Sequence, residues 1–552
     1  MSAVEYDVVI IGSGAGGGTM AYALSRRKWR VLVLEAGPSF DPSKDYKLHT
    51  EGWEQQQFPH KPSSEGRQTF AELQALDPAL SDLCSWNSVE GRLNKQSRRL
   101  PFKYHHVRGV GGSTLAFTGE SHRLHPESMQ MRSRFGVAAD WPLTYDMLEP
   151  FYCEAERIVG VVGPADSGAR WRSEPYPLPP HELGYASQQI ARAASSLGMK
   201  WGPNARAALS EPYDHRPNCN YCANCNRGCP RTDKGSVDVT FLRKAVASGY
   251  CTIRAGVVVT RLEVGADDRV TGVHLVNAEG HDEFIVTPKL IVACGAVETP
   301  RLLLASANQY APDGLANESG QVGRNFMETL AWSSSALHGE NVGSFRGLPA
   351  DSISWDYNAP DAIAGVVGGC RFSTGVAEAG LNGPVAYAQR IVGGWGRSHQ
   401  AAMREAFGRI LTVGAIGESL PNTGTFVDLD PNQVDPNGVA LARIHSQLEP
   451  MDLERLTFMR TTARAILQAT GAGDVVEEYG SYDFFSSTQV FGTCRMGIAA
   501  EDSVVDSFGR SHRWQNLHII DASIFPSSGG GEAPSLTIEA LGLRAADHIA
   551  GV

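Results

Sequence analysis

Four of the ten cysteines of this 552-residue chain lie in one short stretch: Cys219, Cys222, Cys225 and Cys229, with Pro230 directly after them. Thiolates are soft ligands that suit iron–sulfur clusters or zinc, and a short loop can direct several of them at one centre. The spacing C-x2-C-x2-C-x3-C-P occurs in bacterial iron–sulfur loops, whereas structural zinc sites usually pair their cysteines differently. The stretch predicts an iron–sulfur cluster on these thiols; structural zinc and a metal-free loop are the alternatives.

The N-terminus carries a second chemical signal, a glycine-rich turn between a strand and a helix. An apolar strand over residues 6–11 precedes the turn, and a second strand over 31–34 follows the helix. Glycines here permit a tight turn and let the backbone approach a pyrophosphate at the helix N-terminus. A carboxylate about 20 residues further on can accept bonds from a ribose hydroxyl. The pattern predicts a dinucleotide site with Gly12, Gly14, Gly17 and Glu35.

A second glycine-rich turn contains Gly111, Gly112 and Ser113. Residues 485–552 are again rich in short motifs, whereas residues 316–480 hold strand-like segments and two amphipathic helices without a cofactor signature. We therefore expect residues 316–480 to contact substrate. A bound dinucleotide together with a cysteine cluster indicates an enzyme that takes two electrons from a substrate and passes them on singly.

Composition narrows the class of protein. With 42% hydrophobic and 20% charged residues, the chain is globular, and its length favours two domains. The net charge of −11 argues against a nucleic-acid partner, which requires a basic footprint. No apolar run is long enough to predict a membrane span. The start of the chain shows no signal peptide, so we expect a cytoplasmic protein, or a periplasmic one if a signal-bearing partner exports it.

Together these motifs resemble the glucose–methanol–choline (GMC) family of FAD oxidoreductases over nearly the whole chain. The resemblance also rests on residues 291–304, 492–497, 516–523 and 534–541. It implies an α/β (α+β overall) fold, with a Rossmann-like FAD domain built from discontinuous segments and a substrate domain with an antiparallel sheet and helices. We expect the FAD domain to comprise 1–40, 101–150, 216–315 and 481–552, and the substrate domain 41–100, 151–215 and 316–480.

Within that family, the cysteine stretch looks like that of the catalytic subunits of bacterial FAD-dependent sugar dehydrogenases. Those proteins hold a [3Fe–4S] cluster on a C-x5-C-x3-C pattern, which Cys219, Cys225 and Cys229 reproduce. Cys222 could complete a [4Fe–4S] cluster or be a spectator.

The resemblance implies non-covalent FAD, because Leu115 stands where we expect the attaching His of some relatives. It places Asp521 and Ala522 near the pyrophosphate and ribityl groups and Thr537 at a helix start facing the flavin. Val259 is expected either to meet the adenine through its backbone or to be an ordinary core residue.

The chain departs from the family at the catalytic positions. The family usually has a His three residues before Gly492 and a His or Asn directly before Pro534; here Gln489 and Ala533 stand there, with Glu532 alongside. Gln can hydrogen-bond a substrate hydroxyl but cannot take its proton. Three interpretations are open: an engineered His-to-Gln change, Glu532 as the base with a pKa raised by an apolar pocket, or different flavin chemistry.

The resemblance thus implies an FAD-dependent dehydrogenase that oxidises a CH–OH group of a sugar or glycoside by hydride transfer to flavin N5. Electrons would leave through the cluster to an external acceptor, and such relatives often work with a small partner subunit and a cytochrome. The alternatives are a cluster-free, oxygen-using oxidase of long-chain or other alcohols, and a catalytically altered flavoprotein.

Overall fold

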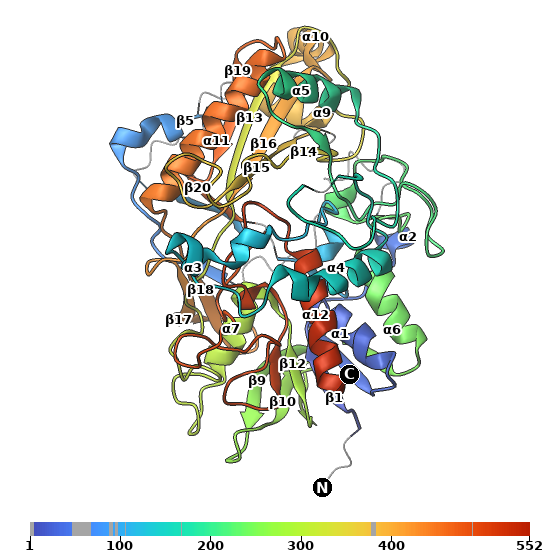
Figure 1. Ribbon diagram of the computed structural model, residues 1–552, viewed down its shortest axis with the longest axis vertical. Helices are drawn as coiled ribbons and strands as arrows, with labels where there is room; N and C mark the ends of the chain where they lie inside the picture. The colour runs from blue at the N-terminus through green and yellow to red at the C-terminus, as the bar shows by residue number, and fades with distance from the viewer. Residues whose placement is uncertain are drawn as a thin grey trace.

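The computed structural model describes residues 5–46, 68–84, 86–87, 92–93, 98–104, 106–166, 168–376, 382–487 and 489–551. These residues form two lobes, one around a parallel sheet next to both chain ends and one around a larger antiparallel sheet (Figure 1).

The first lobe is built on a five-stranded parallel sheet in the order β21-β12-β1-β2-β8. The strands are β1 (Val8–Ile11), β2 (Val31–Glu35), β8 (Cys251–Ala255), β12 (Leu290–Val292) and β21 (Leu517–Ile519). Strands of parallel sheets are covered on both faces and are therefore continuous apolar runs, as residues 8–11 and 31–34 are. Helix α1 (Ala15–Ser25) packs against α12 (Ser535–Ala550), so the two chain ends build one unit. The expected Rossmann-like α/β core is confirmed.

The second lobe contains an eight-stranded sheet in the order β5-β4-β19-β13-β16-β15-β14-β7. Its strands are β4 (Trp86–Asn87), β5 (Arg92–Leu93), β7 (Gly202–Pro203), β13 (Leu330–Leu337), β14 (Ser352–Ser354), β15 (Cys370–Thr374), β16 (Ile410–Gly417) and β19 (Val475–Gly480). Side chains alternate across a strand. Trp332, Phe372 and Val413 therefore bury one face in a core with α5 (Tyr185–Ser196) and α11 (Pro450–Ala469). The neighbouring residues of the central strands face the other way, toward the first lobe.

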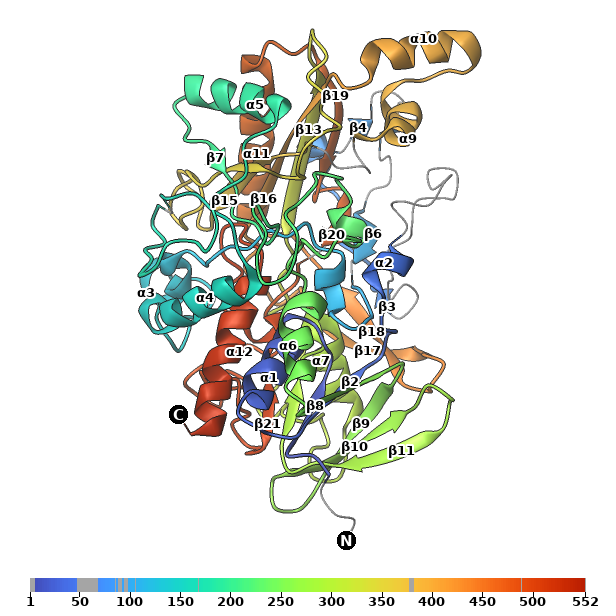
Figure 2. The same cartoon turned by 90° about the vertical axis from the view of Figure 1, so that its right-hand side faces the viewer.

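Smaller elements connect and flank the two lobes (Figure 2). The further strands are β3 (Gln68–Phe70), β6 (Leu100–Tyr104), β9 (Val258–Val264), β10 (Val270–Val276), β11 (Asp282–Val286), β17 (Phe426–Val434), β18 (Ala440–His445) and β20 (Phe484–Ser487). The further helices are α2 (Pro42–Asp45), α3 (Met131–Phe135), α4 (Tyr145–Val159), α6 (Arg243–Ala247), α7 (Gly295–Ala305), α9 (Pro384–Ala386) and α10 (Gly396–Ala406). The two amphipathic helices expected in the middle of the chain are α10 and α11.

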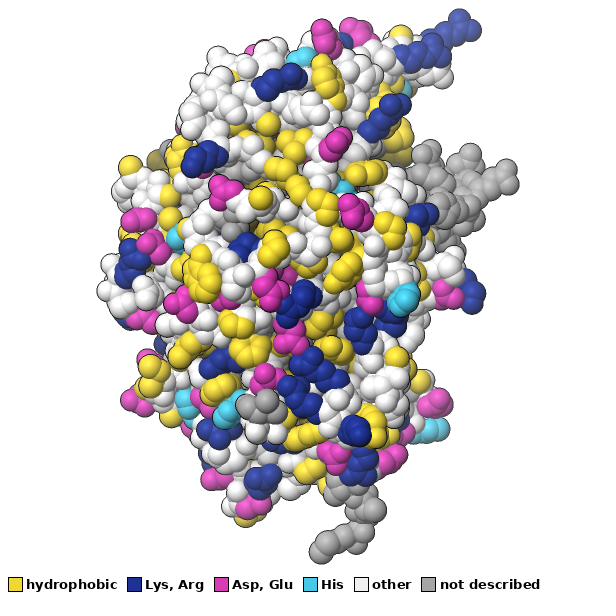
Figure 3. Space-filling model, turned by 45° about the vertical axis from the view of Figure 1, so that its right-hand side comes forward, with side chains coloured by type: hydrophobic (Ala, Val, Ile, Leu, Met, Phe, Trp, Pro, Cys, Tyr) yellow, Lys and Arg dark blue, Asp and Glu magenta, His cyan; other side chains and the backbone are white. Residues whose placement is uncertain are grey.

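None of the helices that the structure describes is long and apolar enough to cross a membrane. On the face drawn in Figure 3, Lys and Arg side chains are interspersed with Asp and Glu side chains. The division into FAD and substrate domains at the expected residue boundaries stays a proposal.

Candidate active site

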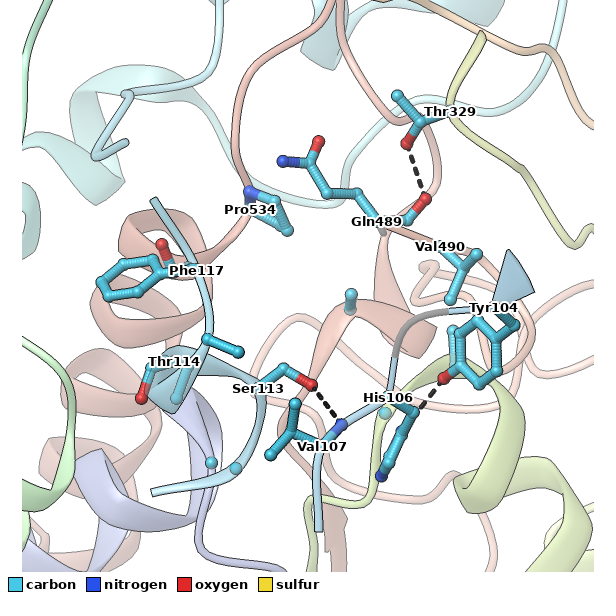
Figure 4. Close-up of a pocket in the computed structure, with 18 of the residues that line it drawn as sticks. Tyr104, His106, Val107, Ser113, Thr114, Phe117, Thr329, Gln489, Val490 and Pro534 are labelled. Carbon is cyan, nitrogen blue, oxygen red and sulfur yellow. Dashed lines mark hydrogen bonds between the residues drawn. The ribbon is translucent and has the colours of Figure 1, made fainter. Parts of the chain in front are cut away.

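A cavity of about 1090 Å³ extends from the glycine turns of the first lobe to the antiparallel sheet of the second. The glycine-turn end includes Gly12, Gly14, Gly112 and Ser113, and the sheet end includes strands β13, β15 and β16. Figure 4 shows the region between them, where Ser113, Gln489 and Pro534 come from widely separated parts of the chain. A single cavity therefore joins the predicted cofactor site to the predicted substrate region.

The two glycine turns face each other at one end of this cavity. Gly112 has φ +57, and a Cβ on it would lie 2.7 Å from the Cα of Gly14. A Cβ on Gly12 would lie 2.4 Å from the carbonyl oxygen of Ala293. Side chains at these positions would collide with backbone and force the turns apart, so glycine is required for the close packing that shapes this end of the cavity. The residues present fit a dinucleotide.

Glu35 lies at the carboxyl end of β2, is buried and lines the cavity. Its Oε2 accepts from the Ser13 N–H at 3.0 Å and the Ser13 hydroxyl at 2.6 Å. Its Oε1 accepts from the N–H groups of Gly37 at 2.9 Å and Gly109 at 3.2 Å. Burial raises the pKa of Glu35, although these hydrogen bonds oppose the shift. Glu35 thus fixes the two glycine turns relative to each other, and its contact with a ribose stays a prediction.

The remaining predicted cofactor residues divide into two groups. Val259, Asp521 and Ala522 line the cavity, as Gly12, Gly14, Gly112 and Ser113 do. Gly17, Gly111 and Thr537 are not among the described lining residues. A Cβ on Gly17 would lie 1.9 Å from the carbonyl oxygen of Gly12, and the Thr537 hydroxyl shares a hydrogen bond with the Tyr152 hydroxyl at 2.8 Å. These residues support the walls of the cradle.

The two positions that depart from the family pattern belong to the same cavity. Gln489 and Ala533 both line the cavity, and the Gln489 side chain points toward Pro534 (Figure 4). The Thr329 hydroxyl donates to the backbone carbonyl of Gln489 at 2.6 Å. The N–H of Ala533 donates to Nδ1 of His122 at 3.1 Å. Backbone contacts thus hold both positions at the cavity.

Glu532, the alternative base, lies outside the described cavity lining. It is 2% exposed, and its Oε1 accepts from Arg170 Nη2 at 2.7 Å and from the His125 N–H at 3.0 Å. The base role of Glu532 stays a prediction.

One buried ion pair in the cavity wall was not predicted from the sequence. Arg371 Nη2 donates to Glu120 Oε2 at 2.7 Å, and both residues line the cavity. Burial opposes the ionisation of Glu120, but Arg371 and His122 hold its pKa at about 2. The only sign in the sequence was an arginine between apolar residues in Cys370-Arg371-Phe372.

A row of small side chains on the antiparallel sheet was also missed. Ser333 on β13 pairs with Gly414 on β16, which pairs with Ser373 on β15, and all three line the cavity. Arg371 and Ile416 pair in the adjacent row of the same face. The sheet therefore presents hydroxyl groups and open space toward the cofactor cradle.

The cysteine loop, residues 219–229, borders the cavity through Asn226. All four thiols are free; Cys219 and Cys225 are buried, and Cys222 and Cys229 are half-buried. Burial raises the pKa of each thiol, that of Cys229 to about 11.

These thiols do not form a ligand set in the structure. In the described part of the chain, no three His, Cys, Asp or Glu side chains converge to hold a metal ion. Cys229 instead donates to Asp233 Oδ1 at 3.4 Å, while Asp233 Oδ2 and Asn226 Oδ1 are buried and accept no hydrogen bond from the residues that the structure describes. The donor chemistry suits a cluster, but the geometry shown does not fit one.

Two family models described as GMC oxidoreductase match residues 106–331 and 421–542, and a model described as an NAD(P)-binding Rossmann-like domain matches 10–40. The chain is 28% identical to 2-methyl-1,2-propanediol dehydrogenase of Mycolicibacterium austroafricanum over 99% of its own length and 96% of that protein. It is 28% identical to the fructose dehydrogenase large subunit of Gluconobacter japonicus, covering 98% and 97%. The crystal structure of pyridoxine 4-oxidase from Mesorbium loti shares the fold, with a TM-score of 0.66, 18% identity and coverage of 99% and 100%.

Proposed function

The chain belongs to the GMC oxidoreductase family of enzymes acting on CH–OH donors, and from this premise we propose that it oxidises a CH–OH group of a sugar or glycoside. The observation that carries the proposal is the sheet end of the cavity. Its Ser333 and Ser373 hydroxyls can each donate and accept a hydrogen bond, as the hydroxyls of a polyol also do. The charge of Arg371 is balanced by that of Glu120. The sheet end of the cavity therefore favours a neutral polyol over a substrate that carries a carboxylate.

FAD supplies the two-electron acceptor when bound. Gly12, Gly14, Gly112 and Ser113 would hold it, through backbone and hydroxyl groups at the glycine turns. It requires no covalent link, since Leu115 is buried and apolar. Asp521, Ala522 and Val259 would contact the rest of the molecule.

Gln489 would orient the substrate hydroxyl by a hydrogen bond from its amide. It cannot accept the hydroxyl proton, and Ala533 has no group that could. The proton therefore leaves to water or to a group outside this pair. A positioned base typically contributes about 10²–10⁴-fold to the rate, so we expect the chain as it stands to be slow.

We assign the electrons to an external acceptor, with a small partner subunit and a cytochrome as the proposed carriers. Support comes from the relative named as the large subunit of fructose dehydrogenase, a name that implies further subunits.

We also propose an iron–sulfur cluster on Cys219, Cys222, Cys225 and Cys229, and this proposal rests on their spacing and on the position of their loop beside the cavity. No reaction step is assigned to the cluster, because the thiols do not converge.

We further propose that the protein resides in the cytoplasm, or in the periplasm after export with a partner.

One observation favours a second candidate, an oxygen-using alcohol oxidase without a cluster. The thiols are free and not arranged as ligands, and an enzyme that reacts with oxygen needs no second electron carrier.

A metal and cofactor assay tests both candidates. Protein purified without oxygen is assayed for iron, sulfide, zinc and FAD, and then screened with sugars using an artificial electron acceptor or oxygen. FAD with iron, and sugar turnover only with the artificial acceptor, would support the dehydrogenase. FAD without metal, and oxygen consumption with alcohols, would support the oxidase. Failure of every alcohol to bleach the flavin would contradict both.

A further inference from the structure

Lys234 is fully buried between the cysteine loop and the second glycine turn, here residues 111–117. Its ammonium donates to three backbone carbonyls, those of Cys225 at 2.6 Å, Leu115 at 2.9 Å and Phe117 at 3.1 Å. An ammonium has three N–H donors, so each acceptor matches one donor. One of these carbonyls belongs to the cysteine loop and two belong to the turn.

The residues directly after Lys234 contact the same turn. The N–H of Val237 donates to the Thr114 hydroxyl at 3.0 Å, and that hydroxyl donates to the carbonyl of Gly111 at 2.6 Å. The Cβ of Asp238 lies 3.2 Å from the position that a Cβ on Gly111 would occupy. The turn therefore rests on this segment through both hydrogen bonds and close packing.

We propose that Lys234 is a positioning residue that couples the cysteine loop to the flavin-binding turn. The inference rests on the proposed flavin site but not on the sugar substrate or on a cluster. One ammonium holds carbonyls of both segments. If either segment moves, the ammonium must follow it or lose a hydrogen bond, and following it weakens the bonds to the other segment. Both segments also border the cavity, through Phe117 and Asn226. Ligand binding at the turn then stabilises the loop, and an ordered loop strengthens binding by the same factor.

Hydrogen–deuterium exchange on the full-length protein, with and without FAD, tests the coupling, since exchange reports local opening. We expect FAD to slow exchange in residues 111–117 and also in the cysteine loop. Protection of the turn with unchanged exchange in the loop would overturn the proposal. Failure of FAD to bind at all would instead count against the proposed function.

The substitution Lys234→Met provides the sharper comparison. It removes the donors while keeping a long apolar stem, and we expect FAD to protect the turn but no longer the loop, with FAD affinity lowered about tenfold, within the usual range of site coupling. Lys244→Met is the matched control, because the Lys244 ammonium donates to the Asp214 carboxylate instead of to the carbonyls of the turn. Loop protection retained in Lys234→Met would overturn the proposal. If this variant does not fold, the comparison of the unmodified protein with and without FAD decides alone.

Discussion

The carboxylate of Glu120 and the guanidinium of Arg371 meet at 2.7 Å although 251 residues separate them in the chain. Arg371 Nε also donates to the backbone carbonyl of Gly531 at 2.6 Å. The pair thereby ties the antiparallel sheet to the loop that precedes Ala533. This long-range ion pair therefore fixes the cavity wall close to Ala533, two residues after Gly531.

The ion pair of Glu120 should make the free energy of unfolding depend on pH in the acid range. Its folded-state pKa of about 2 lies below the ordinary 4.5, despite burial, because Arg371 and His122 favour the charged form. A depressed carboxyl pKa stabilises the fold fully above the unfolded value and loses that contribution as pH falls through the folded value. We expect the unfolding free energy to fall between about pH 4.5 and pH 2, and to fall less steeply in Glu120→Gln. Urea unfolding across this window measures it.

The exposed pair of Glu127 and Arg134, at 2.6 Å, provides the control for that experiment. Exposed ion pairs contribute only about 0–1 kcal/mol, so Glu127→Gln should leave the pH dependence nearly unchanged. Identical slopes in Glu120→Gln and the unmodified protein would contradict the assigned role of the buried pair.

Restoring a titratable group at position 489 should speed catalysis. Gln489 lines the cavity, and its backbone is held by Thr329, so Gln489→His places an imidazole at a fixed point beside Ala533. We expect alcohol oxidation to rise by about tenfold or more, the lower part of the usual contribution of a general base. Rapid-reaction measurement of flavin bleaching checks this. Gln489→Asn, which cannot titrate, is the control. An equal gain in rate in both variants, or no gain in Gln489→His, would contradict the hypothesis that position 489 lacks a general base.

Gly112→Ala should abolish FAD binding because it forces the two glycine turns apart. The new Cβ would lie 2.7 Å from the Cα of Gly14, which belongs to a tight backbone turn that cannot move aside cheaply. Gly136→Ala is a matched control, since Gly136 also has positive φ, at +75, but no atom within 4 Å of its added Cβ. Flavin content after purification and FAD titration measure the effect. Comparable FAD loss in both variants would point to backbone strain instead of displacement of the two turns.

The sequence predicted the Rossmann-like strands and the glycine turns because their signals are local. Apolar runs and nearby glycines specify β1, β2 and the turns within a few residues of each other, so no distant contact is needed to place them. The Glu120–Arg371 pair and the row of Ser333, Gly414 and Ser373 depend on strand register between segments far apart in sequence. Nothing in local composition determines that register.

The cysteine loop shows why spacing in the sequence does not predict whether thiols converge. Its spacing predicted a ligand set, but the direction of each thiol depends on backbone conformation. Tyr221 and Ala223, on either side of Cys222, both have φ +58, a conformation that non-glycine residues rarely adopt. Spacing alone does not reveal such turns, and they decide whether the thiols converge.

Glu532→Gln tests the remaining base hypothesis. Because the carboxylate is buried against Arg170 and lies outside the described cavity lining, we expect the pH–rate profile to keep its shape. Stability should fall by about 3–5 kcal/mol, the usual cost of leaving one partner of a buried pair uncompensated. Steady-state rates from pH 5 to 9, normalised to folded protein, separate the two effects. Loss of the titration in the pH–rate profile would show that Glu532 is the base after all.

Gly414→Val addresses the size of the substrate. The Cβ of residue 414 meets only atoms 3.8–4.0 Å away, at Ser373 and Trp332, so a valine fits the strand and extends into the cavity between Ser333 and Ser373. Strands favour β-branched residues, and stability should change little. We expect kcat/KM for a sugar to fall at least tenfold, since the side chain would occupy part of the space that we propose for the sugar ring. A small alcohol should be nearly unaffected.

The control for Gly414→Val is Gly202→Val, on the edge strand β7 of the same sheet, where no atom lies within 4 Å of an added Cβ. Because Gly202 is not among the described lining residues of the cavity, this variant should keep the activity of the unmodified protein on both substrates. A selective loss of sugar oxidation in Gly414→Val would assign the substrate site to the β13–β16–β15 face. Equal loss for the sugar and the small alcohol would mean that the valine disturbs the cofactor end, and sugar specificity would then have to arise elsewhere in the cavity.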